Sequence, residues 1–118
     1  MPREVKSTEK TSKTPSRTSR VTKNQAVKYL SRVPEDKVFW CTDGQILKDM
    51  NDLRDSLTNM SDQTFTYHSN EMKQDFSVWI REIVGDEKLA NDLESASTRE
   101  RALFAVESRC DLLSSKIK

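Results

Sequence analysis

The chain has 118 residues, a formal net charge of +1 at pH 7 and 34% hydrophobic residues. This length suits one small domain and is too short for two, because most domains contain about 100–150 residues. No apolar run approaches the roughly 18 residues of a membrane span, and the charged N-terminus lacks the apolar segment of a secretory signal. We therefore expect a cytoplasmic protein that makes no membrane contact.

The charge is unevenly distributed along the chain. Residues 1–26 carry seven Lys or Arg and two Glu, a formal charge of +5, whereas the rest carries thirteen Lys or Arg and seventeen acids, a charge of −4. Residues 1–21 are rich in Ser and Thr and contain almost no large apolar side chain, a composition that cannot form a packed core. We predict a disordered basic arm over residues 1–21 and a folded domain over residues 22–118.

The first predicted helix begins at the start of the folded part. Thr22 and Gln25 have the spacing of a capping box, and a short apolar stripe follows. This helix must end by Val33, because Pro34 disfavours helical geometry in the residue before it.

A β-hairpin is predicted near residues 37–47. The run from Lys37 to Thr42 is dense in β-branched and aromatic residues, and Ile46 and Leu47 form a second apolar run. Asp43-Gly44 lies between the runs, and an Asp-Gly pair in this position is one of the stronger short hairpin signals. One face of the hairpin must pack on helices, because an isolated two-stranded hairpin is only marginally stable.

Two helices are predicted to follow, capped by Asp49 and Ser61. The second is short and ends near His68. The first has apolar residues at intervals of three and four, namely Met50, Leu53, Leu57 and Met60.

The clearest helical period in the chain lies between Asn70 and Gly85. Ser69 or Asn70 is expected to cap this helix, and Gly85 stands where a left-handed residue would end it. Its apolar stripe comprises Met72, Phe76, Trp79, Ile80, Ile83 and Val84. We predict that Phe76, Trp79 and Ile80 form the centre of the core, opposite Leu53, Leu57 and Leu103.

Two further helices complete the predicted domain. Asp86 is expected to cap the first, and Ser97 and Glu100 form a capping-box pattern that opens the second. The apolar seam of this last helix comprises Ala102, Leu103, Val106, Cys110, Leu113 and Ile117. The seam could pack on the domain or pair with another chain; we expect packing and a monomer, because the seam is short for an independent coiled coil.

Together these elements predict a mainly α fold. It is a single small domain of about five or six helices with one short two-stranded hairpin, preceded by the disordered basic arm. Cys41 and Cys110 are the only cysteines and are expected to be reduced core residues. Two distant Cys and one His do not supply the four ligands of a structural zinc site. We expect no metal site and no cofactor.

His68 is the only imidazole, so any His-based catalysis must use it, with Asp43, Asp75 or Asp86 as the orienting carboxylate. The chain has no Gly-x-Ser-x-Gly motif and no signature of an activated cysteine. We therefore predict no catalytic residue and no enzyme activity. His68 is expected to be structural, in a polar junction with Asn70 and Asp75.

The order of residues from Phe39 to about Leu93 resembles a mostly archaeal domain family of uncharacterised function, found free-standing and attached to carbohydrate-active or glycosyl-transferring enzymes. The resemblance depends on Phe39-Trp40, Asp43-Gly44, Leu53, Leu57, Met60, Phe65, His68, Asn70, Asp75-Phe76, Trp79-Ile80, Gly85-Asp86 and Leu89-Ala90. The chain departs from the family pattern at Gln74, where Asn is usual, and at Asp52, where Glu is usual. Attachment to enzymes implies an accessory or docking role.

We therefore predict a non-catalytic protein-interaction or accessory module with a protein partner. The alternative is weak, sequence-independent binding of nucleic acid through the arm, although the negative charge of the folded part opposes phosphate. The cations of the arm that would make these contacts are Arg3, Lys6, Lys10, Lys13, Arg17, Arg20 and Lys23.

Overall fold

The computed structural model describes residues 21–118, so almost all of the predicted arm lies outside the described residues. The described part is mainly α-helical with one two-stranded antiparallel sheet, which confirms the predicted fold class. Its elements in chain order are α1 (Lys23–Leu30), η2 (Glu35–Lys37), β1 (Phe39–Trp40), β2 (Ile46–Leu47), α2 (Met50–Asn59), α3 (Asp62–His68), α4 (Asp75–Trp79), η3 (Ile80–Val84), α5 (Glu87–Ser95) and α6 (Arg99–Ile117).

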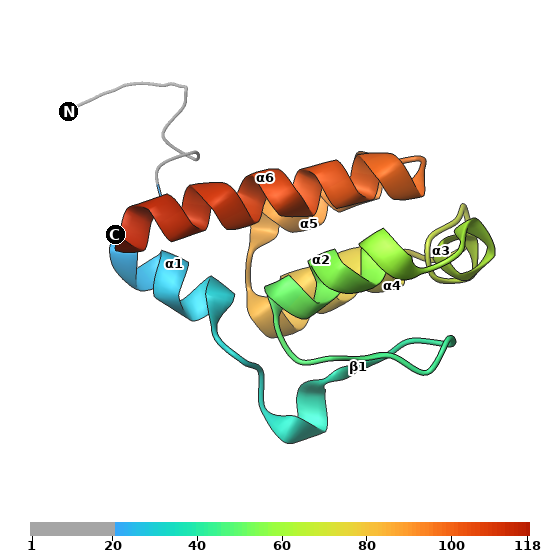
Figure 1. Cartoon of the computed structure of the whole chain (residues 1–118), viewed down its shortest axis with the longest axis horizontal. Coiled ribbons are helices and arrows are strands. Elements are labelled where there is room, and N and C mark those ends of the chain that lie inside the picture. Colours follow the sequence, from blue (N-terminus) through green and yellow to red (C-terminus); the bar gives the residue numbers. More distant parts are fainter. Residues whose placement is uncertain (1–20) are drawn as a thin grey trace.

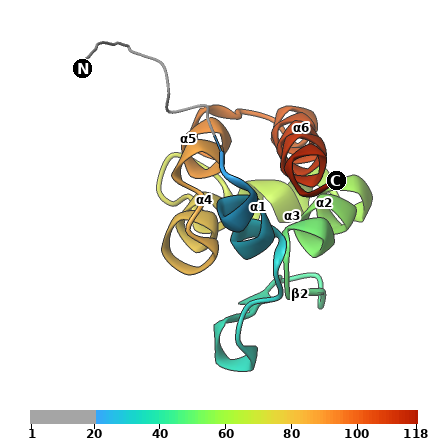
Figure 2. The same cartoon turned by 90° about the vertical axis from the view of Figure 1, so that its left-hand side faces the viewer.

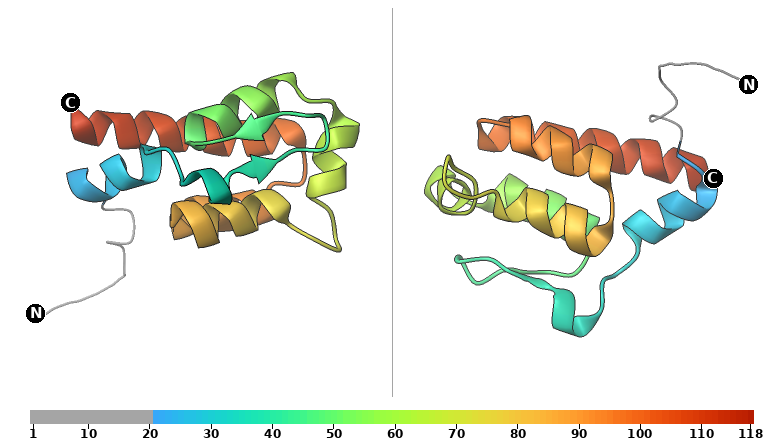
Figure 3. Two further views of the ribbon diagram at one scale, coloured as in Figure 1. Left: turned by 90° about the horizontal axis from the view of Figure 1, so that it is seen from below. Right: turned by 180° about the vertical axis from the view of Figure 1, so that it is seen from behind.

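The longest helix, α6, is the element on which the others assemble. It packs against α1, α2, α3 and α5, and Figure 1 shows it along the top of the domain with α1 beneath its C-terminal end. Seen from the end, α2, α4, α5 and α6 surround a common centre and α1 covers the near end (Figure 2). The hairpin lies on the side opposite α6: it is below α2 and α4 in the right view of Figure 3 and nearest the viewer in the left view, which is seen from below.

Side-chain caps define where most helices begin. The predicted capping box is present in α1, since the main-chain N–H of Gln25 donates to the Thr22 hydroxyl and the Thr22 N–H donates to the Gln25 side chain. The predicted caps Asp49, Ser61 and Asp86 are also confirmed at the starts of α2, α3 and α5. Each cap satisfies a main-chain N–H that the first helical turn leaves without a partner.

The predicted cap of the last helix is wrong by one residue. Thr98, and not Ser97, caps α6, and its hydroxyl accepts from the N–H of Arg101. Ser97 and Glu100 have the spacing of a capping box, whereas Thr98 is followed three residues later by Arg101, yet the helix begins at Arg99.

The predicted helix around Phe76 is shorter than its apolar period indicated. Helix α4 begins only at Asp75 and continues as the π-helical turn η3, which ends at Gly85 with a left-handed φ of 93°. Met72 is 91% exposed, so its assignment to the core is wrong. The reason lies in Asn70, which does not cap α4: its side-chain oxygen accepts from the N–H groups of Met72 and Lys73 and holds this segment as a turn.

The predicted centre of the core is confirmed. Phe76, Trp79 and Ile80 are buried, as are Leu53 and Leu57 of α2. Leu103 is only partly buried and packs at the margin of this cluster. The hydrophobic core therefore lies between α6 and the hairpin.

Candidate functional site

The hairpin is the part of the fold that offers main-chain groups to a partner. Phe39 pairs with Leu47 and Trp40 with Ile46, so each strand contributes one inward and one outward side chain. Residues 41–45 join the two strands, and the hydrogen bond between Cys41 and Gln45 closes a three-residue loop, Thr42 to Gly44. Gly44 has a φ of 96°. Three-residue hairpin loops commonly consist of a turn followed by a residue in the left-handed conformation, and glycine adopts that conformation without steric cost.

His68 fastens the loop end of the hairpin to the helices. The main-chain N–H of Thr42 donates to His68 Nε2 at 3.0 Å, and His68 Nδ1 lies 3.0 Å from a carboxylate oxygen of Asp75. Since Nε2 accepts a hydrogen bond, the proton of the neutral ring resides on Nδ1 and is donated to Asp75. The ring is buried against Phe39 and Phe76, with centroid distances of 5.1 and 5.3 Å. Both ring nitrogens are thus engaged in holding structure together.

The predicted polar junction is assembled only in part. The structure brings His68 and Asp75 into contact, and Asp75 also pairs with Lys73 at 3.2 Å. Asn70 instead donates from its side-chain amide to the carbonyl of Thr66, at the end of α3. The other two carboxylates considered for His68 have different partners: Asp43 accepts from the N–H of Gln45, and Asp86 pairs with Arg109.

Trp79 fastens the other end of the hairpin. Its indole N–H donates to the carbonyl of Lys37 at 2.8 Å, two residues before β1 begins. Phe39 stacks on Phe76 with centroids 5.1 Å apart and meets Trp79 edge to face. The hairpin is therefore held in place by the core at both ends rather than by its own short ladder.

Within residues 21–118, both outer edges of the hairpin have one open main-chain position, Trp40 on β1 and Ile46 on β2. Bonded and non-bonded pairs alternate along an antiparallel ladder, and the pair next to the loop is bonded, Cys41 N–H to Gln45 C=O at 2.9 Å. The next pair, Trp40 and Ile46, is therefore a non-bonded one whose main-chain groups point away from the partner strand.

The outer edge of β2 is occupied at one residue and vacant at another. At Lys48 the carbonyl accepts from the N–H of Val33 at 2.8 Å, and the N–H donates to the Asp52 carboxylate at 2.9 Å. Two residues earlier on the same edge, the main chain of Ile46 has no such partner within residues 21–118. Ile46 thus presents one free N–H and one free C=O.

A groove of about 350 Å³ lies beside this open position, between β2 and α2. Its lining residues are Gln45, Ile46, Leu47, Asp52, Asp55, Ser56 and Asn59. Ser56 is 4% exposed, and its hydroxyl is the one buried side-chain polar atom of the described residues without a hydrogen-bond partner. Such groups are uncommon in folded proteins, since each costs about 1–3 kcal/mol. The groove therefore combines an open strand edge with an unused hydroxyl.

An apolar pair lies on the solvent face of the hairpin at the same position. Trp40 and Ile46 are directly opposite each other, and they are 71% and 37% exposed. Directly opposed side chains on one face of a sheet are close enough to form a continuous surface.

The remaining reactive groups do not form a chemical site. Cys41 and Cys110 are free and buried, and burial raises the pKa of both thiols, that of Cys110 to about 11. At neutral pH neither is a thiolate nucleophile. Within the described residues, no cluster of three or more His, Cys, Asp or Glu is arranged to hold a metal ion.

Of the predicted arm cations, only Lys23 is described, and it begins α1 on the surface. The other six lie in residues 1–20, outside the described part. Sequence reasoning missed the groove, because a free main-chain edge has no side-chain signature. The alternation of Phe39 and Trp40 between the two faces was a usable signal for the exposed pair.

Among residues 21–118 there is no helix with the length and apolar character that crossing a membrane requires. Comparisons of the chain with protein-family models, with curated proteins and with solved structures gave no match.

Proposed function

We propose that the protein is a non-catalytic interaction module that binds an extended segment of another protein along the outer edge of β2. In this mode a peptide adds a strand to an exposed sheet edge and gains affinity from main-chain hydrogen bonds. The observation that carries the proposal is the free N–H and C=O of Ile46, a residue that lines the groove beside α2. The clamping of the hairpin by His68 and Trp79 supports it, because a fixed edge loses little entropy on binding.

The contact would be of moderate strength. One open position supplies two main-chain hydrogen bonds, each worth about 0.5–1.5 kcal/mol. Further affinity has to come from side chains, and the exposed pair of Trp40 and Ile46 is the nearest apolar surface. We infer a transient partner in the cytoplasm and a monomeric module, with the free thiols of Cys41 and Cys110 suited to a reducing compartment.

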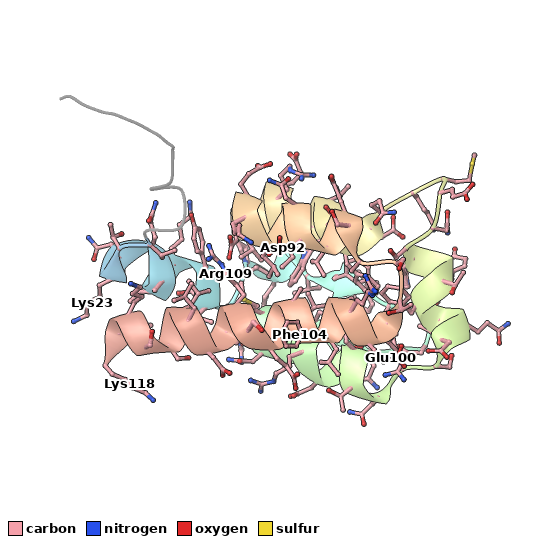
Figure 4. The ribbon with its side chains drawn as sticks, turned by 90° about the horizontal axis from the view of Figure 1, so that it is seen from above. Lys23, Asp92, Glu100, Phe104, Arg109 and Lys118 are labelled. Atoms are coloured by element: carbon pink, nitrogen blue, oxygen red, sulfur yellow. The ribbon has the colours of Figure 1, made fainter. Side chains whose placement is uncertain are left out.

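The decisive experiment compares three single variants of the full chain. Peptides are first selected on the wild-type protein from a displayed library of random sequences, and their affinities for Ile46→Pro, Trp40→Ser and Phe104→Ser are then measured. Proline removes the free N–H at Ile46 without removing a bond of the hairpin, because this N–H points away from β1. Phe104 on α6 is 70% exposed, close to the 71% of Trp40, and belongs to a different face (Figure 4).

We expect Ile46→Pro and Trp40→Ser to weaken binding about five-fold or more, since each removes contacts worth more than about 1 kcal/mol. Phe104→Ser should bind as the wild type does. Peptides that tolerate both hairpin variants and lose affinity for Phe104→Ser would move the interaction surface to α6 and refute the proposal. Circular dichroism of each variant verifies that the fold is retained.

A further inference from the structure

The chemistry of the groove between β2 and α2 points to a particular kind of partner. Its charged lining residues are Asp52 and Asp55, and no Lys or Arg lines it among the described residues. Building on the function proposed above, we propose that the groove takes a basic extended segment in which one apolar residue lies between two Lys or Arg. On the α2 side the groove is lined by polar and acidic residues, whereas Trp40 and Ile46 form an apolar surface on the solvent face of the hairpin, so the two faces of an added strand would meet different surfaces.

Because successive side chains of a β-strand point to opposite faces, these two surfaces favour a particular sequence in the bound segment. A residue that pairs with Ile46 places its side chain on the face of Ile46 and Trp40, where apolar contact is available. Its two neighbours point to the opposite face, because successive side chains alternate across a strand. That is the face on which Leu47 is buried and against which α2 packs.

The two carboxylates of the groove differ in how free they are. Asp52 already accepts a hydrogen bond from the N–H of Lys48, so it contributes a fixed negative charge at the end of the groove where the β2 edge is occupied. Asp55 is 66% exposed at its side chain, and its contact with the neighbouring Arg54 is long, at 3.4 Å. A cation of the partner can therefore pair with Asp55 without breaking a short ion pair.

The unused hydroxyl of Ser56 belongs to the same groove. Ser56 and Asp52 are four residues apart on one helix, so they lie on neighbouring turns of the same face of α2. A hydroxyl can both accept from an ammonium or guanidinium group and donate to a main-chain carbonyl. The hydroxyl is inaccessible to solvent in the free protein, so a bound segment satisfies it only after the Ser56 side chain turns toward the groove.

The test uses the full chain and four fluorescein-labelled heptapeptides, with affinity measured by fluorescence anisotropy. The first is Thr-Thr-Lys-Val-Lys-Thr-Thr. The second and third replace both Lys by Ser or by Glu, and the fourth keeps the charges but carries an N-methyl group on the Val nitrogen. The protein variants are Asp55→Asn and the matched control Asp36→Asn, which removes an exposed carboxylate in η2, away from the groove lining.

The Lys peptide should bind, the Ser peptide should bind at least about five-fold more weakly, and the Glu peptide should not bind measurably. N-methylation should weaken binding by about two- to ten-fold, because Val can no longer donate to Ile46. Asp55→Asn should weaken binding of the Lys peptide by about two- to five-fold, the range of an exposed ion pair, and Asp36→Asn should not. Binding should also slow hydrogen exchange at the Ile46 amide, while the Leu47 amide, already bonded within the hairpin, changes little.

The outcomes separate the two proposals. If the Ser peptide binds as tightly as the Lys peptide but N-methylation weakens both, the basic preference is wrong and strand addition stands. If N-methylation has no effect, or the Lys peptide does not bind at all, strand addition and the basic preference are both refuted. If neutralising the cations of residues 1–20 in the full chain strengthens binding of the uncharged Ser peptide, which they do not repel, the basic arm of the chain competes for the groove, and a separate partner is not its occupant.

Discussion

Removing Arg109 should destabilise the domain severely, because it leaves a buried carboxylate without its counter-charge. Arg109 and Asp86 are 8% and 0% exposed, and they form two hydrogen bonds of 2.7 and 2.8 Å. In Arg109→Met the Asp86 carboxylate retains only its cap contact with the N–H of Leu89, at 3.2 Å. Breaking a buried pair by removing one partner costs about 3–5 kcal/mol, a large part of the roughly 5–15 kcal/mol that stabilises a typical domain.

The measurement is urea unfolding followed by circular dichroism. With a denaturant dependence of about 1.5 kcal/mol per molar, the expected loss lowers the midpoint by about 2–3 M. The double variant Asp86→Ser, Arg109→Met is the matched control: Ser still caps α5, and both buried charges are gone. We expect the double variant to recover most of the loss, since a buried ion pair replaced as a whole is close to neutral. An Arg109→Met protein within about 1 kcal/mol of the parent, or a double variant no better than the single one, would refute this reasoning.

Four further predictions concern other parts of the chain. Phe76→Ala should cost about 3–5 kcal/mol in urea unfolding, because a large buried ring is lost from the core; a melting temperature within a degree or two of the parent would contradict this. His68→Gln should cost about 1–3 kcal/mol and raise hydrogen exchange at the Thr42 amide. It should still bind peptide, although more weakly, because the loop end of the hairpin is less fixed while the Trp79 bond remains. In the native protein the Cys110 thiol should resist alkylation at pH 8, since its pKa of about 11 leaves little thiolate, and should react once urea unfolds the chain. Replacing the six cations of residues 1–20 by Gln should abolish most binding of duplex DNA. For the parent protein, log K should fall with log salt at a slope of about −0.9 per phosphate contact. Salt-insensitive or sequence-specific binding would contradict the arm hypothesis.

Local signals allowed the elements of this fold to be predicted well. A cap acts within four residues, so Thr22, Asp49, Ser61 and Asp86 could each be assigned without knowledge of the tertiary structure. The spacing of apolar residues identified the buried faces of the helices, because this spacing is also a local property of the sequence. It failed at Met72, because a local turn competed with the helix and the period alone cannot show which conformation is more stable.

Features that depend on two distant segments could not be predicted in the same way. Asp86 was recognised as a cap, but its pairing with Arg109 joins residues 23 apart and requires the packing of α5 on α6. The contact of His68 with Asp75 was anticipated from proximity in sequence, whereas its bond to Thr42 depends on where the hairpin lies. The open edge at Ile46 is a property of strand register, and any outward-facing residue at that position would have the same free main-chain groups.

The packing of α1 against α6 also affects how the chain can fold as it is synthesised. Helix α1 ends at Leu30, and the helix that covers it spans Arg99–Ile117. At about 5–20 residues per second, a ribosome needs about 4–17 s to make the intervening chain and α6. During this interval α1, α2 and α5 lack the surface that buries their apolar faces. The native packing of these three helices on α6 therefore forms only after the last helix has been made.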